Sequence, residues 1–145
     1  MDFHTFSRYS DIVYAERWNQ RPQQHNFTSH ELEALNTSVT VILTAPYTNY
    51  ARQLLITKQM FEPMLKLDLD HQSTSKTMTP KYMLYSGHDD NIANHLLAYM
   101  PDVGFQNIPY AASIYLELYD VFGVWYVRGQ YNGTPAKLRG CGGHA

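Results

Sequence analysis

The sequence predicts a mixed α/β domain, because helical and strand-like hydrophobic patterns both occur in it. Apolar residues recur at helical spacing through most of the first half of the chain. Aromatic and β-branched runs with alternating polarity follow in the second half. A length of 145 residues, of which 44% are hydrophobic, suits one domain with its own core or a piece of a larger one.

Residues 1–67 are expected to be a mainly helical region. Apolar side chains recur at helical spacing over residues 3–18, and Pro22 lies in the break that follows. Residues 28–31 have the form of a capping box, in which a threonine hydroxyl and a glutamate satisfy free amides at a helix start. An apolar stripe continues from there until Pro46 ends the pattern.

A third amphipathic segment covers about residues 48–66, where Pro63 predicts a kink or an early stop. Residues 68–80 are polar, rich in Ser and Thr and without periodicity, so they are expected to form a surface loop. This loop would lead into a compact unit of strand, helix and hairpin over residues 81–141.

Tyr82–Ser86 is expected to be a short buried strand, which ends in Gly87 and delivers His88 and Asp89 side by side. A helix is expected over residues 91–100, where a proline terminates it. Ligands of open α/β sheets bind outside the carboxyl ends of strands, so a reactive pair at this place indicates a site.

Residues 112–119 and 124–131 are rich in aromatic and β-branched side chains, and the turn-forming residues 120–123 join them. This arrangement predicts a β-hairpin. The apolar residues that fall on one face of its first strand are Ile114, Leu116 and Leu118.

The charge pattern argues against a nucleic-acid partner, since the net charge is −2 and a basic patch would be expected for such a partner. No segment is long and apolar enough to cross a membrane. Charged residues interrupt residues 1–14, so no signal peptide is expected there.

Cys141 is the single cysteine and cannot form a disulfide within the chain, so it is a free thiol or half of a bridge to a partner outside it. Asn26, Asn36 and Asn132 each begin a glycosylation acceptor triplet. These features favour a secretory route, lysosomal or extracellular, for the parent protein.

The chemistry that His88 and Asp89 can perform follows from their place before a helix. The first amides of a helix and the positive end of its dipole favour an anion. A protonated histidine adds a donor to phosphate oxygens, and a carboxylic acid can protonate a departing alkoxide. A plainer interpretation stays open, in which Asp89 or Asp90 caps the helix and His88 is an ordinary turn residue.

Residues 85–89, 108–119, 125–128 and 138–141 together resemble the C-terminal portion of the histidine acid phosphatases, which include related phytases. The resemblance is strong over residues 81–141 and loose before them. It implies a three-layer, phosphoglycerate-mutase-like α/β fold, represented here by its C-terminal part with a helical region. It implies no metal and no organic cofactor.

By this resemblance the expected function is hydrolysis of phosphomonoesters through a phosphohistidine intermediate, with His88 as a phosphate ligand and Asp89 as the general acid. The family's nucleophilic histidine lies in an Arg-His-Gly segment, and no such triplet occurs in this chain. The isolated chain is therefore expected to be inactive. Ser113 stands where family members often carry a cysteine, which implies that one family disulfide is absent. The substrate stays open among small phosphomonoesters, phosphoproteins and inositol phosphates.

The chain's arginines offer no replacement for the family's phosphate clamp. Arg52, Arg128 and Arg139 lie outside any family phosphate motif, and we expect them to be surface or ion-pair residues.

Two other classes remain open. A metal-dependent HD-type phosphohydrolase also uses a His-Asp pair, and His71, Asp90 and His95 could then be further ligands. A non-catalytic remnant or structural and interaction module would keep the same partial fold. Whether the chain is a fragment of an active enzyme or an inactive remnant, its predicted sheet lacks neighbouring strands. We therefore expect the N-terminal half of the same domain, or a protein partner, to cover the edge of this sheet.

Overall fold

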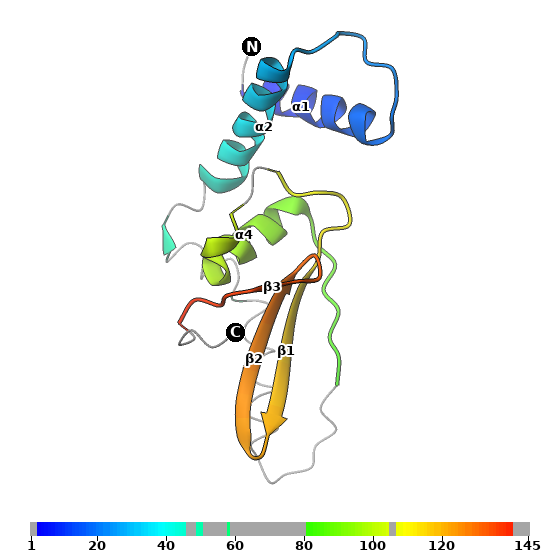
Figure 1. The fold of residues 1–145 in the computed structure, drawn as a ribbon. Coiled ribbons are helices and arrows are strands. Elements are labelled where there is room, and N and C mark those ends of the chain that lie inside the picture. Colours follow the sequence, from blue (N-terminus) through cyan, green and yellow to red (C-terminus); the bar gives the residue numbers. More distant parts are fainter. Residues whose placement is uncertain (1–2, 46–48, 51–57, 59–80, 105–106, 141–145) are drawn as a thin grey trace.

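The computed structural model describes residues 3–45, 49–50, 58, 81–104 and 107–140. These residues form a mixed α/β arrangement (Figure 1). In chain order its elements are α1 (Phe3–Trp18), α2 (Ser29–Thr44), α4 (Asp89–Tyr99), the 3-10 helix η2 (Pro101–Val103), β1 (Ile114–Val121), β2 (Val124–Tyr131) and β3 (Thr134–Ala136). The helices gather at one end of the molecule, and the hairpin of β1 and β2 projects away from them.

The start of α2 confirms the predicted capping box. The Thr28 backbone amide donates a hydrogen bond of 2.8 Å to Glu31 Oε2, and the Thr28 hydroxyl oxygen accepts one of 3.3 Å from the Glu31 amide. Both groups are local in sequence, so this helix start needs no tertiary partner. The helix ends at Thr44, which lies two residues before Pro46 and agrees with the predicted stop.

The predicted hairpin is confirmed. Strands β1 and β2 pair antiparallel without a bulge from Ile114 opposite Tyr131 to Val121 opposite Val124. Positive φ angles of 54° at Phe122 and 82° at Gly123 close the turn between them. Such angles at both central residues are typical of the tight turn that matches the twist of the two strands.

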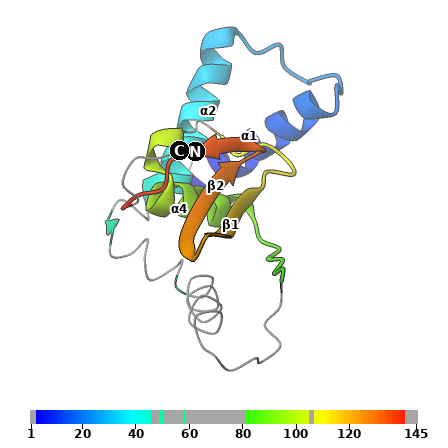
Figure 2. The same ribbon diagram turned by 60° about the horizontal axis from the view of Figure 1, so that its bottom comes forward.

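A third strand, β3, extends this sheet in the order β1-β2-β3 and was not expected. Its signal is the pair Asn132-Gly133, with φ angles of 48° and 77°, which forms the turn that joins β2 to β3. Asn-Gly between two strand-like runs is the strongest short-range hairpin signal. The strand covers only the end of β2 nearest the helices, from Gly129 to Tyr131 (Figure 2).

The buried strand predicted at Tyr82–Ser86 is wrong. The segment has no regular secondary structure and pairs with no strand in the described part of the chain. Tyr82 is 68% exposed and Leu84 is 78% exposed. A strand needs a neighbour to accept its backbone hydrogen bonds, and all the described strand pairs belong to the antiparallel sheet. The predicted third helical segment, the polar loop at 68–80 and Cys141 lie outside the described residues, apart from residues 49–50 and 58.

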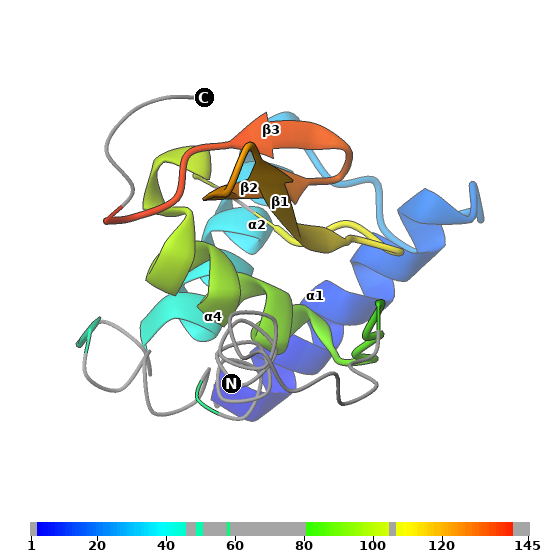
Figure 3. The same ribbon diagram turned by 90° about the horizontal axis from the view of Figure 1, so that it is seen from below.

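The hydrophobic core lies where α2, α4 and the near end of the sheet meet, and Figure 3 shows α4 and α2 beside the sheet. Its buried members are Leu43, Ala93, Leu96, Met100 and Ile108. Partly buried side chains of all three strands pack against this cluster. Asp89–Tyr99 agrees closely with the predicted helix, and the buried residues of α4 lie mainly in its second half.

Gly129 of β2 is the place where the core comes nearest to a strand backbone. A Cβ atom at this position would lie 2.7 Å from Met100 Cε and 2.8 Å from Leu138 Cδ2. The absence of a side chain therefore allows these two residues to pack directly on the strand.

None of the helices in the described part of the chain combines the length and the apolar character that crossing a membrane requires.

Candidate functional site

His88 and Asp89 lie at the beginning of α4. His88 is the N-cap residue, with extended backbone angles, and Asp89 is the first helical residue. The His88 amide donates a hydrogen bond of 2.8 Å to Asn91 Oδ1, which satisfies one donor before the helix begins. A Cβ atom on Gly87 would lie 2.7 Å from the same Asn91 oxygen. The sequence Gly87-His88-Asp89-Asp90-Asn91 therefore shapes this helix start locally.

Both candidate catalytic side chains are exposed. Asp89 Oδ1 accepts a hydrogen bond of 2.9 Å from the amide of Asp90, so this carboxylate already serves the helix start with one oxygen. Asp89 is not the N-cap, but the contact gives it a local structural role at the helix start, as the plainer interpretation expects. A carboxyl group has a second oxygen, so the contact is also compatible with proton donation.

Asp11 of α1 is a neighbour of Asp89 that the sequence did not predict. Burial raises the pKa of Asp11 above its ordinary value of 3.8, and the negative charge of Asp89 raises this pKa further. No sequence pattern marks Asp11, because it lies far from Asp89 in the sequence and their electrostatic interaction arises only in the fold. The negative charges of Asp11 and Asp89 would repel a dianionic phosphate. Phosphoryl transfer depends on positive charge around the phosphate oxygens, so cations would have to offset this repulsion.

Inside the first turns of α4, two side chains hold buried oxygen atoms. Asn94 is 1% exposed, and its amide nitrogen donates a hydrogen bond of 2.7 Å to the Asp90 carbonyl oxygen. Within the described part of the chain, Asp90 Oδ1 and Asn94 Oδ1 have no hydrogen-bond partner. Asp90 thus faces the interior, whereas the neighbouring Asp89 faces solvent.

Arg128 and Arg139 behave as the sequence predicts. Arg128 Nε donates a hydrogen bond of 2.7 Å to Glu117 Oε2, which makes an ion pair on the hairpin. Arg139 donates to the Leu97 carbonyl oxygen at 3.2 Å, and its guanidinium lies 4.6 Å from the centre of the Tyr50 ring.

Arg139 thus contacts α4 near the end opposite to the candidate site, about 12 Å along the helix from Asp89 at roughly 1.5 Å per residue. Neither of these two arginines supplies charge beside His88. Arg52 lies outside the described residues.

Of the residues considered as further metal ligands, the structure describes Asp90 and His95, both on α4. His95 is buried on α4, its ring stacks on Tyr99 with centroids 5.8 Å apart, and burial lowers its pKa. Among the residues that the structure describes, no three His, Cys, Asp or Glu side chains lie together in a way that could hold a metal ion. His71 is outside those residues.

The three glycosylation acceptors are all exposed. Asn26 precedes α2, Asn36 lies within that helix, and Asn132 lies in the turn between β2 and β3. The Asn132 side-chain oxygen accepts a hydrogen bond of 2.8 Å from the Ser113 amide. Asn132 therefore has a structural role in the turn, in addition to its place in an acceptor triplet.

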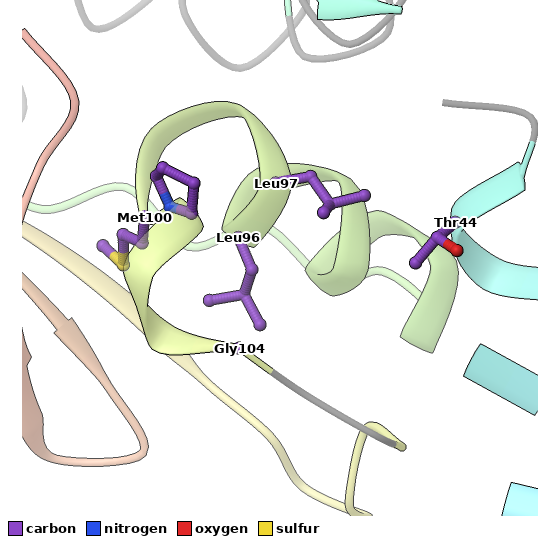
Figure 4. A pocket seen from close by; sticks show the side chains of 6 residues that line it. Thr44, Leu96, Leu97, Met100 and Gly104 are labelled. Carbon is purple, nitrogen blue, oxygen red and sulfur yellow. The ribbon is translucent and has the colours of Figure 1, made fainter. Parts of the chain in front are cut away.

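Two shallow hollows occur at the far end of α4, and neither is lined by His88 or Asp89. The first, of about 180 Å³, is mainly apolar (Figure 4) and is lined by Thr44, Leu96, Leu97, Met100, Pro101 and Gly104. The second, of about 300 Å³, is lined by Pro101, Asp102, Lys137, Leu138, Arg139 and Gly140. The candidate site is thus an exposed helix start and not one of these hollows.

Comparison of the chain with models of known protein families, with curated proteins and with solved structures finds no match. The resemblance to histidine acid phosphatases therefore depends on the residues of this chain alone.

Proposed function

We propose that this chain contributes one side of a phosphomonoesterase site, in which Asp89 is the proton donor and His88 is a phosphate ligand. The observation that carries the proposal is the exposed, adjacent placement of both side chains at the N-terminus of α4. Helix amides and the helix dipole favour an anion at this position.

The proposed reaction has two steps. A histidine supplied from an Arg-His-Gly segment outside this chain attacks phosphorus, the phosphorus–oxygen ester bond breaks, and Asp89 gives its proton to the departing alkoxide. The Asp89 carboxylate then takes a proton from a water molecule whose oxygen attacks the phosphohistidine. The phosphorus–nitrogen bond breaks, inorganic phosphate leaves, and both the histidine and the protonated Asp89 are restored. His88 would donate to the phosphate oxygens throughout. No metal or organic cofactor enters either step.

The complete protein in this proposal has the three-layer, phosphoglycerate-mutase-like fold and follows a secretory route, with glycans at Asn26, Asn36 and Asn132. Its N-terminal half supplies the nucleophile and the cations that His88 alone does not provide. Those cations also have to offset the negative charge of Asp11 beside Asp89. The substrate class includes small phosphomonoesters, phosphoproteins and inositol phosphates.

A second candidate is a non-catalytic interaction module. The exposure of Tyr82 and Leu84 favours it, since an unpaired apolar segment before the His-Asp pair is not the supporting strand that the catalytic fold requires. In this case Asp89 only stabilises the start of α4, as its hydrogen bond from the Asp90 amide allows.

The test is the turnover of phosphomonoesters by the parent protein that carries this chain, with and without Asp89→Asn. Loss of the proton donor is expected to slow hydrolysis of an alkyl phosphate by roughly 10²–10⁴-fold. Hydrolysis of a nitrophenyl phosphate should fall much less, because its leaving group needs no proton. Asp102→Asn, at an exposed acid in η2, is the matched control and should leave both rates unchanged.

Equal rates for Asp89→Asn and wild type on the alkyl ester would contradict the assignment of Asp89. No turnover by the wild-type parent protein would favour the interaction module. His88→Ala tests the role of His88 as a phosphate ligand separately from proton donation by Asp89. Loss of this ligand should weaken the binding of inorganic phosphate as a product inhibitor.

A further inference from the structure

The end of the hairpin that points away from the helices exposes large apolar side chains. Phe122 at the turn is fully exposed at 103%, and Val124 and Tyr126 of β2 are each about half exposed. Leu118 of β1 is 39% exposed. Several exposed apolar side chains at one end of a sheet favour an interaction site there.

Among the strands that the structure describes, β1 also forms an edge of the sheet, since the order is β1-β2-β3. The opposite edge, β3, is three residues long and contains Pro135, so it offers little backbone for pairing. In contrast, β1 has eight residues in unbroken register with β2. It contains no proline, no lysine and no bulge, which are the usual features that protect an edge strand.

The hairpin register shows which backbone groups of β1 face outward. Val121 and Val124 flank the two-residue turn, so Val121 and every second residue before it bond to β2. The short contact from the Asn132 amide to the Ser113 carbonyl oxygen, at 2.9 Å, continues the same alternation. The outward backbone groups therefore belong to Ile114, Leu116, Leu118 and Asp120.

We propose that β1 pairs with β1 of a second copy of this chain about a two-fold axis and makes one continuous antiparallel sheet. Because the helices of one copy lie at one end of its hairpin (Figure 1), antiparallel pairing places the helices of the two copies at opposite ends of the joined sheet. Outward residues must oppose outward residues, which restricts the register. Leu118 then lies opposite Leu118 of the second copy, and Leu116 lies opposite Asp120 of that copy.

The charges of β1 are compatible with an identical strand. Glu117 is paired with Arg128 within its own copy, and Gln130 donates a further hydrogen bond of 2.8 Å to the same carboxylate. The Asp120 carboxylate accepts a hydrogen bond of 2.7 Å from the Gly123 amide. In the proposed register Asp120 lies opposite the apolar Leu116 of the second copy, so acids of the two copies do not lie directly opposite each other.

The same charges select the register. A shift that places Glu117 opposite Glu117 of the second copy is disfavoured, because like charges directly opposite on a sheet repel. The proposed register instead places Glu117 opposite Tyr119 of the second copy. Apolar contact between the two Leu118 side chains lies at the axis.

The test is sedimentation equilibrium of the chain and of Leu118→Lys. Wild type is expected to dimerise, and Leu118→Lys should raise the dimer dissociation constant by more than about tenfold, since two lysines then meet at the axis. The matched control is Val127→Lys, which adds the same charge opposite Leu118 but on the central strand. This control should remain dimeric.

A mixture of Leu118→Lys and Leu118→Glu should form a mixed dimer, because opposite charges then meet at the axis. Two results would overturn the proposal: a wild-type chain that stays monomeric at high micromolar concentration, or equal weakening by Leu118→Lys and Val127→Lys. A monomeric wild type would instead indicate that another part of the parent protein covers the β1 edge.

Hydrogen exchange of the wild-type chain gives a second readout that needs no variant. The outward amides of Leu116, Leu118 and Asp120 should exchange more slowly as concentration rises, whereas the Tyr119 amide, which bonds to β2, should not change. If the exchange rates of the outward amides and of the Tyr119 amide changed equally with concentration, the proposed pairing would also be contradicted. Both readouts are independent of phosphatase turnover, since β1 does not contain His88 or Asp89.

Discussion

The two ends of one hairpin differ in burial although their sequences are similar. At the end near the helices, Ile114 and Leu116 of β1 pack against a cluster that includes Leu96 and Met100. At the other end, Leu118 continues the same alternating pattern but is 39% exposed. The alternating sequence pattern therefore determines which residues pair as strands. Packing against another element determines whether the side chains of those strands are buried.

The forces that hold the two ends differ accordingly. The near end gains from apolar burial against α2 and α4, which is the larger contribution per residue. The far end depends on the backbone ladder, the turn and the exposed Glu117–Arg128 pair. An ion pair in contact with water contributes little, because water screens it and ordering two side chains costs entropy.

The largest expected effect is therefore at the near end. Leu96→Ala removes a side chain that is 1% exposed, and we expect it to lower the free energy of unfolding by about 3 kcal/mol, since it leaves a cavity between α4 and the sheet. Denaturant titration measures this change. The matched variant Leu118→Ala, at concentrations where the chain is monomeric, should cost less than about 1 kcal/mol. Similar costs at the two positions would contradict the comparison.

The same contrast separates what the sequence predicts from what it does not. The capping box at Thr28 and the turn at Phe122-Gly123 depend on neighbouring residues, so their signals are local. The Asn132-Gly133 turn has an equally local signal, which coincides with the glycosylation acceptor triplet that begins at Asn132. The strand expected at Tyr82–Ser86 needed a partner strand that is distant in sequence, which an apolar run cannot reveal.

The candidate site follows the same rule. His88 and Asp89 at a helix start were predictable, because the helix pattern and the Gly87-His88-Asp89 order are local. The approach of Asp11 was not predictable, since it depends on how α1 packs. The burial of His95 has the same origin, because a single histidine does not show which face of its helix will meet the core.

His95 gives a smaller effect, which depends on pH. Burial lowers its pKa from the ordinary value of 6.5, so the unfolded chain binds a proton at a higher pH than the folded chain does. Stability should then be greatest above about pH 6.5 and fall as the pH decreases towards the lowered value. His95→Gln should flatten this decline in acid denaturation curves.

Leu96→Ala is the control for that measurement, because it should lower stability without altering the slope against pH. An unchanged slope in His95→Gln would show that protonation of His95 does not cause the decline. The prediction also bears on the proposed reaction, since a phosphatase active in acid would work where His95 stabilises the fold least.

The smallest expected effect belongs to the turn at the exposed end. Phe122 has a positive φ of 54°, which costs energy for a bulky side chain, and its ring is fully exposed. The equivalent position of the other turn, between β2 and β3, is Asn132, with a similar φ of 48°. Asparagine tolerates this conformation better, so the two turns of one sheet differ in how well their residues fit.

Phe122→Asn should therefore raise the free energy of unfolding by about 0.5 kcal/mol, since it replaces a strained residue without removing a buried contact. Asn132→Phe is the reciprocal change and should lower stability by more, because it also removes the hydrogen bond from the Ser113 amide to the Asn132 side chain. If Phe122→Asn instead destabilised the monomer, the phenyl ring would be making contacts in the folded chain. Side-chain packing would then stabilise the far end of the hairpin in addition to its backbone hydrogen bonds and its turn.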